Sequence, residues 1–364
     1  MKKILYFIFA LFFNICRVFP VKKRLAVFLA PHRGGAHDSL SEFEKYVISR
    51  GECKTVRVSS SPDSVKEAVS FFLRAPYILA RAGYVFLNDN FMPLSSLRFS
   101  PETVIVQFWH GEGAFKKFGL LTNLPEDIRN REIKSGGKLS YVICTSENVR
   151  ETYAKAFGVD ESKVLPLGSP RLDYLLNNSD KENALESVFN MYPAVRGKKL
   201  VLYAPTFRDN PEDDREILSH IDAHAFEEAL GDEYALLVKL HPQVHSAVPG
   251  GINDVTDCDI GALSLACDIL VTDYSSVCMD FAVLEKPFIF SAYDLPKYEH
   301  DRSFCFGYKD YVPGEVVTDF DSVIKAIKNP RNAEKIGRFR EFNFDYIDAH
   351  NSERIYEFIS DNRK

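Results

Sequence analysis

The chain lacks several features by which large classes of protein are recognised. It has 364 residues but only seven cysteines, an odd number at wide spacing with no C-x-x-C pair. This pattern argues against a disulfide framework or a zinc site, and it is typical of reduced thiols in a cytosolic protein. The sequence also has no Walker motif, no G-x-G-x-x-G after its first strand and no G-x-S-x-G. These absences argue against ATPases, dinucleotide-dependent dehydrogenases and α/β-hydrolases.

A basic charge balance is missing as well. The formal net charge is −6 and the sequence pI is about 5.9, which argues against nucleic acid as a partner. No acidic metal-binding cluster is evident, so we predict neither a metal site nor a cofactor, and a requirement for a divalent ion stays open. Hydrophobic residues make up 46% of a chain that is long enough for two domains with large cores.

The N-terminus carries the one notable apolar run, from Ile4 to Phe13. It is shorter than the ~20 residues that span a bilayer, and no small-x-small cleavage site follows it. Because basic residues lie on both sides, we predict that residues 1–20 associate with the cytoplasmic face of a membrane as a peripheral anchor. The alternative is a first helix packed on the protein itself, but a run that is apolar on every side favours the membrane. The flanking basic residues are Lys2, Lys3, Arg17, Lys22, Lys23 and Arg24.

Strand and helix patterns alternate along the rest of the chain. This alternation predicts an α/β fold of two doubly wound parallel-sheet domains that face a cleft. We place an acceptor-side domain at 21–180 and a donor-binding domain at 181–340, with a C-terminal helix at 341–364 expected to cross back to the first domain. The last helical pattern covers 333–359. The predicted strands are 24–30, 54–58, 84–87, 104–108, 141–145, 200–204, 235–240, 269–272 and 288–290.

The segment ILVTDYSSVCMDFAVLEKPFIF joins a buried strand to a helix through hydroxyls and a carboxylate. A helix start leaves backbone N–H groups unpaired and carries partial positive charge, so Ser275 and Ser276 there would complete an anion site, most simply for phosphate. Asp273 and Asp280 would repel phosphate, and we expect them to accept from a ribose or amine or to bond the loop. On this segment alone, a simple capping role for the serines is the favoured interpretation.

Other unusual residues also follow predicted strands, where doubly wound sheets bind ligands. Arg208 suits bidentate contact with phosphate oxygens, or is a surface arginine. His241, beside Lys239, is either a reactive group or a structural histidine that bonds a carbonyl. His245 is unsuited to a metal pair with His241, because Pro242 disturbs the spacing.

The first half contains the motif QFWHGEGAFKKFG. His110 follows a strong strand pattern and suits a general base on an alcohol, and Gly111 lets backbone approach a ligand closely. One histidine at the mouth of each domain, with an arginine and a helix start, indicates a nucleotide-diphosphate donor and an alcohol acceptor.

Taken together and in order, these motifs resemble the CDP-glycerol glycerophosphotransferase family, the teichoic-acid and capsule polyol-phosphate transferases. The similarity covers about residue 20 to the end, and the combination of KLHP, VTDYSS and the R-x-F-x-F-x-Y tail is specific. The motifs that carry it are WHGEGAFKKFG (109–119), LGSPRLD (167–173), YAPTFRD (203–209), KLHP (239–242), DILVTDYSSVCMDFAVLEKPFIF (268–290) and RSFCFGYKDYVPGEVV (302–317).

The resemblance implies a GT-B fold and transfer of glycerol or ribitol phosphate from a CDP-polyol to a hydroxyl of an undecaprenyl-linked glycan or polymer, with loss of CMP. It implies that His110 is the base for the acceptor hydroxyl and that His241 lies at the donor pyrophosphate. The further donor-binding residues that it implies are Arg208, Lys239, Ser275, Ser276, Asp280 and Arg302.

One departure from the family pattern concerns the acceptor. Many members read HGTPLK where this chain has HGEGAFKK, so Glu112 stands beside the proposed base, where it would orient His110, raise its pKa or contact the acceptor. The loop HRGGAHDS also follows a strand of the same domain, which makes His32, His37 and Asp38 candidate acceptor contacts.

The predicted function is therefore polyol-phosphate transfer, glycerol phosphate favoured, in the synthesis of a teichoic-acid or capsule-like polymer. The first alternative is a GT-B glycosyltransferase that uses a UDP- or CMP-sugar. The second is a non-catalytic membrane-bound scaffold, which predicts that His110→Ala and His241→Ala leave function intact in cells.

Overall fold

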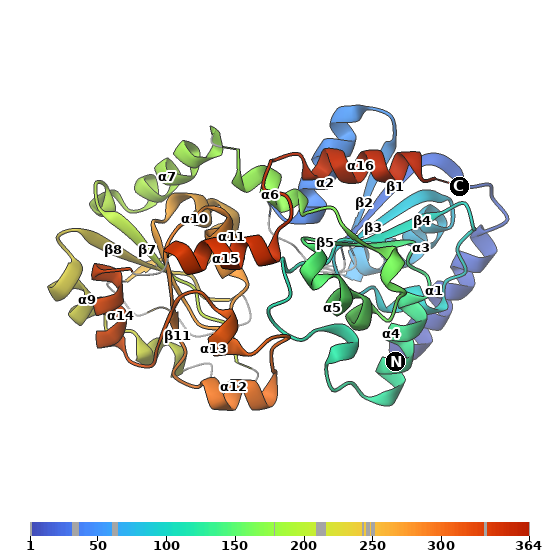
Figure 1. The fold of residues 1–364 in the computed structure, drawn as a ribbon. Coiled ribbons are helices and arrows are strands. Elements are labelled where there is room, and N and C mark those ends of the chain that lie inside the picture. Colours follow the sequence, from blue (N-terminus) through green and yellow to red (C-terminus); the bar gives the residue numbers. More distant parts are fainter. Residues whose placement is uncertain are drawn as a thin grey trace. The chain divides into compact units, whose positions relative to one another are not determined.

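The structure is a computed structural model, and it describes residues 2–30, 36–59, 65–177, 179–208, 216–241, 244, 248, 252–330 and 333–363. The chain divides into two compact units (Figure 1). The first unit comprises Met1–Tyr174 and Asn343–Lys364, and the second comprises Leu175–Phe342. Each unit is built around one parallel sheet.

The sheet of the first unit has the order β2-β1-β3-β4-β5-β6. The direction of strand order reverses between β1 and β3, and ligands of such sheets bind beyond the carboxyl ends of the strands at this point. In its central strands, the residues Leu25–Ala30 and Ala82–Leu87 are apolar and, apart from the partly exposed Tyr84, buried, as expected for parallel strands covered on both faces. The strands are β1 Lys22–Ala30, β2 Lys54–Ser59, β3 Ala82–Leu87, β4 Val104–Gln107, β5 Tyr141–Cys144 and β6 Val164–Pro166.

Helices with one apolar face cover this sheet. On α2, for example, Leu40, Phe43 and Val47 are buried at helical spacing, and Gly51 closes the helix in the left-handed conformation (φ 67°) that glycine adopts without strain. The helices of the unit are α1 Lys2–Cys16, α2 Ser39–Arg50, α3 Val65–Ala80, α4 Glu126–Gly136, α5 Glu147–Phe157, α6 Pro170–Leu175 and α16 Asn351–Asp361.

The N-terminal helix α1 packs against α3 through part of its surface. Phe9 and Phe13 are fully buried, and the Phe9 ring stacks on Phe71 of α3 at 5.5 Å. The remaining apolar residues of α1 stay exposed, including Phe7 at 68% and Leu11 at 49%. No helix in the described part of the chain is long and apolar enough to cross a membrane.

The sheet of the second unit has the order β12-β11-β10-β7-β8-β9, with its reversal between β7 and β10. The loops that follow these two strands carry Arg208 and Ser275, so the strand order places both motifs at the predicted ligand edge. The strands are β7 Lys199–Tyr203, β8 Tyr234–Val238, β9 Asn253–Asp254, β10 Ile269–Thr272, β11 Phe288–Ser291 and β12 Glu315–Val317. The helices are α7 Ser179–Met191, α9 Ala223–Leu230, α10 Ile260–Ala266, α11 Val277–Val283, α12 Leu295–Asp301, α13 Tyr308–Tyr311, α14 Phe320–Lys328 and α15 Ala333–Asn343.

All nine predicted strands are present, one expected helix is interrupted, and three short strands were not predicted. The helical pattern over 333–359 is interrupted, because α15 ends at Asn343 and α16 begins at Asn351. Between them, the Asp345 amide donates to the Thr145 carbonyl, and the Asp345 carboxylate accepts from the amide of Glu147 at the start of α5. These tertiary bonds replace helical ones. The strands β6, β9 and β12 were not predicted, because strands of only two or three residues are too short to show a periodic pattern of apolar residues.

No disulfide joins any two of the seven cysteines, all of which the structure describes. Burial raises the pKa of the Cys144 and Cys267 thiols to about 12, so both are protonated at neutral pH.

Candidate active site

In the first unit, His110 lies in the turn after β4, directly after Trp109, whose backbone is strained and held by hydrogen bonding. Trp109 has a positive φ of 64°, which is unusual for a bulky residue and is found where surrounding structure enforces it. The enforcing group is Gln107, whose side-chain oxygen accepts from the Trp109 amide at 2.9 Å. The Trp109 ring stacks on Phe118 at 4.9 Å and lies 4.0 Å from the His110 ring. The turn therefore fixes the direction in which His110 projects.

Two acceptor groups lie near Nδ1 of His110. This atom lies 3.3 Å from the Asn88 carbonyl oxygen and 3.7 Å from the Asp89 carboxylate. Both groups accept hydrogen bonds and donate none, so these contacts favour the tautomer with the proton on Nδ1 and the lone pair on Nε2. The side chain is 52% exposed. A neutral histidine with its lone pair on Nε2 is a form that acts as a general base.

Glu112 and Gly111 lie beside this histidine in sequence and are tied to other parts of the unit. The Glu112 carboxylate accepts from the hydroxyls of Ser39 (3.2 Å) and Ser169 (3.0 Å). The Gly111 carbonyl accepts from the Tyr153 hydroxyl at 2.7 Å. The role of Glu112 towards the acceptor stays a prediction.

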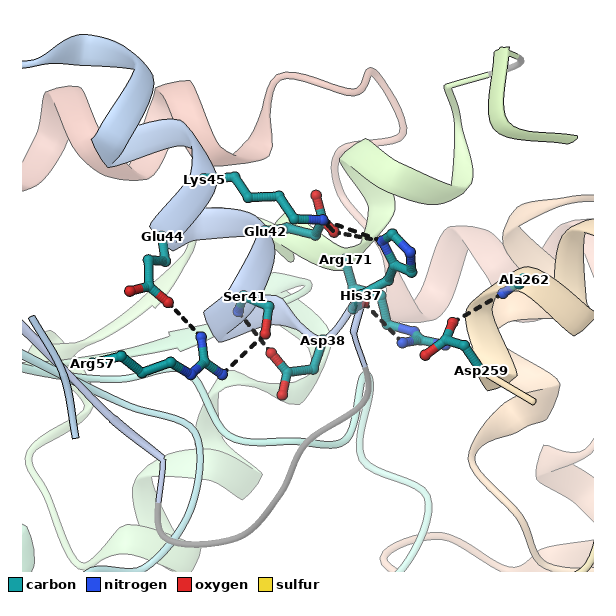
Figure 2. A network of polar contacts seen from close by, with 10 residues as sticks. All are labelled: His37, Asp38, Ser41, Glu42, Glu44, Lys45, Arg57, Arg171, Asp259 and Ala262. Atoms are coloured by element: carbon teal, nitrogen blue, oxygen red, sulfur yellow. Dashed lines mark hydrogen bonds and ion pairs between the residues drawn. The ribbon is translucent and has the colours of Figure 1, made fainter. Parts of the chain in front are cut away.

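His37 and Asp38 lie at the start of α2, where they organise the helix terminus (Figure 2). Asp38 is the N-cap: Oδ1 accepts from the Ser41 amide at 2.7 Å, and Oδ2 accepts from the Asn88 side-chain amide at 3.1 Å. The second contact connects Asp38 to the residue that supports His110. His37 stacks on Tyr174 at 3.5 Å and bonds Glu42 at 2.8 Å. Their acceptor roles stay predictions, and His32 lies outside the described residues.

In the second unit, Arg208 lies in a buried ion network at the reversal of strand order. Its guanidinium makes a bidentate pair with Asp294, at 2.7 and 2.9 Å, and reaches the Asp273 carboxylate at 2.9 Å and the Thr206 carbonyl at 2.6 Å. The side chain is only 6% exposed. Arg208 thus clamps the loops after β7, β10 and β11 together. Its assignment as a donor-phosphate contact stays a prediction, and the contacts seen are those of a scaffold for the loops.

The same network accounts for Asp273. Its Oδ1 accepts from the amides of Thr206 and Tyr274, both at or below 2.8 Å. Of the two roles expected for this carboxylate, bonding the loop is therefore the one that the structure shows. Burial opposes ionisation of both partners, yet their attraction outweighs it: the pKa of Arg208 is raised and the pKa of Asp294 is lowered.

Phe207 brings two of the predicted donor residues together. The His241 ring lies 4.6 Å from the Phe207 ring, and the Arg302 guanidinium lies over the same ring at 5.2 Å. His241 and Arg302 come from segments far apart in the sequence, and both are exposed. The structure therefore forms a partly positive surface at the carboxyl edge of the second sheet. His245, the partner considered for His241, lies outside the described residues.

The other predicted donor residues differ in accessibility. Ser275 and Ser276 are partly exposed at the start of α11, where Ser275 Oγ accepts weakly from the Val277 amide at 3.4 Å. Asp280 is 3% exposed and accepts from Ser264 Oγ of α10 at 3.0 Å. Lys239 donates to the carbonyls of the turn after β9, and burial lowers its pKa. Ser275, Ser276 and Lys239 are thus partly exposed, whereas Asp280 is buried, and the donor roles of all four stay predictions.

Sequence reasoning missed four residues of these networks. Asn88 and Asp89 follow β3 in the run FLNDN, Asp294 follows β11, and Phe207 precedes Arg208. The rule applied to other strand ends, polar residues directly after an apolar strand, would have identified Asn88 and Asp89, whereas Ala292 and Tyr293 separate Asp294 from β11. Within the described ranges, no group of three or more His, Cys, Asp or Glu side chains is arranged to hold a metal ion.

Comparison with known proteins gives concordant results. This structure is similar to a solved structure of the wall teichoic acid polymerase TagF. The TM-score is 0.79 at 24% sequence identity, and the similarity covers 96% of this chain and 92% of that chain. The UDP-GlcNAc 2-epimerase of Neisseria meningitidis matches more distantly, with a TM-score of 0.58 at 15% identity, covering 93% of this chain and 100% of that one. These likenesses confirm the predicted α/β, GT-B-like fold class.

Curated relatives are more similar in sequence. The teichoic acid poly(ribitol-phosphate) polymerase of Bacillus spizizenii is 32% identical over 95% of this chain, which spans only 58% of that polymerase's length. The teichoic acid glycerol-phosphate primase of Bacillus subtilis is 31% identical over 98% of this chain and 96% of its own length. The profile of CDP-glycerol:poly(glycerophosphate) glycerophosphotransferases matches residues 11–361. The chain therefore belongs to the CDP-glycerol:poly(glycerophosphate) glycerophosphotransferase family, as its motifs predicted.

Proposed function

We propose that this protein transfers a polyol phosphate, glycerol phosphate favoured, from a CDP-polyol to a hydroxyl of a lipid-linked or polymeric glycan and releases CMP. The pathway would be synthesis of a teichoic-acid or capsule-like polymer. Family membership supports the reaction class. The observation that carries the proposal is His110, whose Nδ1 faces two acceptor groups and whose Nε2 is thereby left with the lone pair of a base.

The proposed chemistry is an in-line substitution at phosphorus. His110 Nε2 takes the proton of the acceptor hydroxyl as that oxygen attacks the phosphorus atom nearest the polyol. The bond from this phosphorus to the CMP oxygen breaks, and CMP leaves. His241 and Arg302 around Phe207, with the hydroxyls of Ser275 and Ser276, would offset the charge on the pyrophosphate. Donors fixed before the reaction are effective because they need no reorganisation.

The deciding experiment measures CMP release by the purified protein. CDP-glycerol and CDP-ribitol are supplied separately, with and without a lipid-linked disaccharide acceptor, and UDP-sugars are supplied in parallel. Acceptor-dependent CMP release with one donor would support the proposal and name the polyol, and the length of the product would separate priming from polymerisation. Consumption of a UDP-sugar with no CMP release would instead support a glycosyltransferase.

The two serines give a prediction for the donor. The double variant Ser275→Ala, Ser276→Ala is expected to raise the KM for the CDP-polyol by roughly 10- to 100-fold, since a hydrogen bond to a charged group contributes about 1.5–3 kcal/mol. Steady-state kinetics at saturating acceptor measure this. Ser187→Ala, which removes an exposed hydroxyl from α7 of the same unit, is the control. An unchanged KM would show that the serines only begin the helix.

We further propose that α1 docks the protein on an anionic membrane surface, near its lipid-linked acceptor. Apolar side chains stay exposed on α1 and on the adjoining helix α3, including Phe7, Leu11 and Leu73. Basic residues flank the helix on its C-terminal side, including Arg17, Lys22 and Lys23. This combination of apolar surface and positive charge suits the boundary between lipid headgroups and acyl chains.

Vesicle co-sedimentation tests this docking. Phe7→Glu with Leu11→Glu is expected to weaken binding to vesicles of anionic lipid by roughly 100-fold, because burying each apolar side chain contributes about 1.5–3 kcal/mol. The control is Ile48→Glu, which changes a residue 55% exposed on α2. Equal binding of all three proteins would contradict the proposal.

A further inference from the structure

Asp89 lies after β3, beside the proposed base of the neighbouring strand β4, and has no role in the chemistry derived above. We propose that Asp89 is a positioning residue, which holds His110 in the tautomer protonated on Nδ1 and stabilises the imidazolium formed when Nε2 takes the acceptor proton. The inference rests on the proposed function, in which His110 is the base.

The first support is that Asp89 is fixed from two directions. Its Oδ1 accepts from the Asn90 amide at 2.6 Å, and its backbone carbonyl accepts from the Gln107 side-chain amide at 3.2 Å. The other carboxylate oxygen, Oδ2, is the one 3.7 Å from His110 Nδ1. A carboxylate held in this way can direct a histidine without moving itself.

The second support is that one side chain couples the carboxylate to the histidine turn. Gln107 donates to the Asp89 carbonyl and accepts from the amide of Trp109, the residue in the left-handed conformation that precedes His110. The ends of β3 and β4 are therefore locked in one arrangement. Strain of this kind persists only where the surroundings enforce it, and here it sets the direction of the histidine.

The third support is the pattern of charge around the pair. Among the described residues, two further carboxylates bond the asparagines beside Asp89: Glu132 from α4 accepts from the Asn90 side chain at 3.2 Å, and Asp38 from α2 accepts from the Asn88 side chain. Burial and the Asp89 carboxylate both raise the pKa of Glu132. Asp89, with its side chain 18% exposed, has a carboxylate oxygen 3.7 Å from His110 Nδ1.

The proton and the bonds balance in this scheme. The acceptor O–H bond breaks, its proton moves to His110 Nε2, and the new bond forms between the acceptor oxygen and phosphorus as the bond to CMP breaks. The histidine then carries two N–H groups, with Nδ1–H directed at Asn88 and Asp89. It returns its proton to solvent before the next turnover. Asp89 neither gives nor takes a proton in this scheme.

The test compares Asp89→Asn with Asp127→Asn, which removes a half-exposed carboxylate from α4 of the same unit. Asp89→Asn keeps the size of the side chain and an oxygen for the Asn90 amide. We expect kcat to fall by roughly 10- to 100-fold, KM for the donor to stay unchanged, and the acid limb of the pH profile to move to lower pH by about one unit. In a His110→Ala background, Asp89→Asn should not lower kcat any further, because Asp89 acts through the histidine.

A readout without substrate keeps this inference separate from the proposed function. Nitrogen NMR of the histidine rings, with His110→Gln to assign the signal, should show Nδ1 protonated in the unmodified protein and a shift towards the Nε2-protonated form in Asp89→Asn. An unchanged tautomer and pH profile in Asp89→Asn would overturn the inference. Absence of CMP release from any CDP-polyol, with the tautomer shift still present, would overturn the proposed function alone.

Discussion

Replacing His110 with glutamine is expected to lower acceptor-dependent CMP release by about 10²- to 10⁴-fold, the usual contribution of a general base. Glutamine retains a nitrogen that can donate to the Asn88 carbonyl, but it has no lone pair to take a proton at neutral pH. Affinity for the CDP-polyol should change little, because the donor residues proposed here belong to the other unit. Stopped CMP assays give the rate, and calorimetry gives the donor affinity.

The matched control is His224→Gln. This histidine of α9 is 92% exposed and should leave both rate and affinity unaltered. A His110→Gln protein that is folded, binds donor and turns over at the unmodified rate would remove His110 from the mechanism. It would also remove the principal support for the proposed reaction.

The second large effect concerns stability and arises from the ion network of Arg208. Arg208→Met is expected to destabilise the second unit by about 3–5 kcal/mol, because it leaves two carboxylates without their buried counter-charge. For a unit of this size the melting temperature should fall by roughly 10 °C. Differential scanning calorimetry, which resolves the transitions of two units, is the measurement. A normal melting temperature with an impaired donor KM would instead assign Arg208 to the donor phosphate.

Arg338→Met provides the control, since the pair of this residue with Glu334 is mostly exposed and should contribute under about 1 kcal/mol. The network also predicts a pH dependence. The pKa of Asp294 is lower in the folded state than its unfolded value of about 3.9, so the pair contributes fully above that value. Its contribution is lost as the pH falls through the folded pKa, and Arg208→Met should flatten the acid side of the stability curve.

The sequence by itself determined the fold class and most of its elements. Continuous apolar runs such as 200–204 and 269–272 must be buried on both faces, and in alternation with helical patterns they leave a doubly wound parallel sheet as the consistent arrangement. The same rule located the ligand edge, because polar residues directly after such strands can only lie at the carboxyl ends. His110, His241 and Ser275 were identified in this way, and the motifs around them identified the family.

Tertiary structure alone decided what each of these side chains touches. Nothing in the local sequence distinguishes Arg208, buried by Asp273 and Asp294, from Arg302, exposed over Phe207. The difference depends on which loops the strand order brings together, since β7, β10 and β11 are neighbours although β8 and β9 intervene in the chain. Likewise, β3 and β4 together place Asp89 beside His110. The periodicity of apolar residues in the sequence indicates which face of a helix or strand is buried. Contacts between side chains of different loops depend instead on distances that only the folded chain defines.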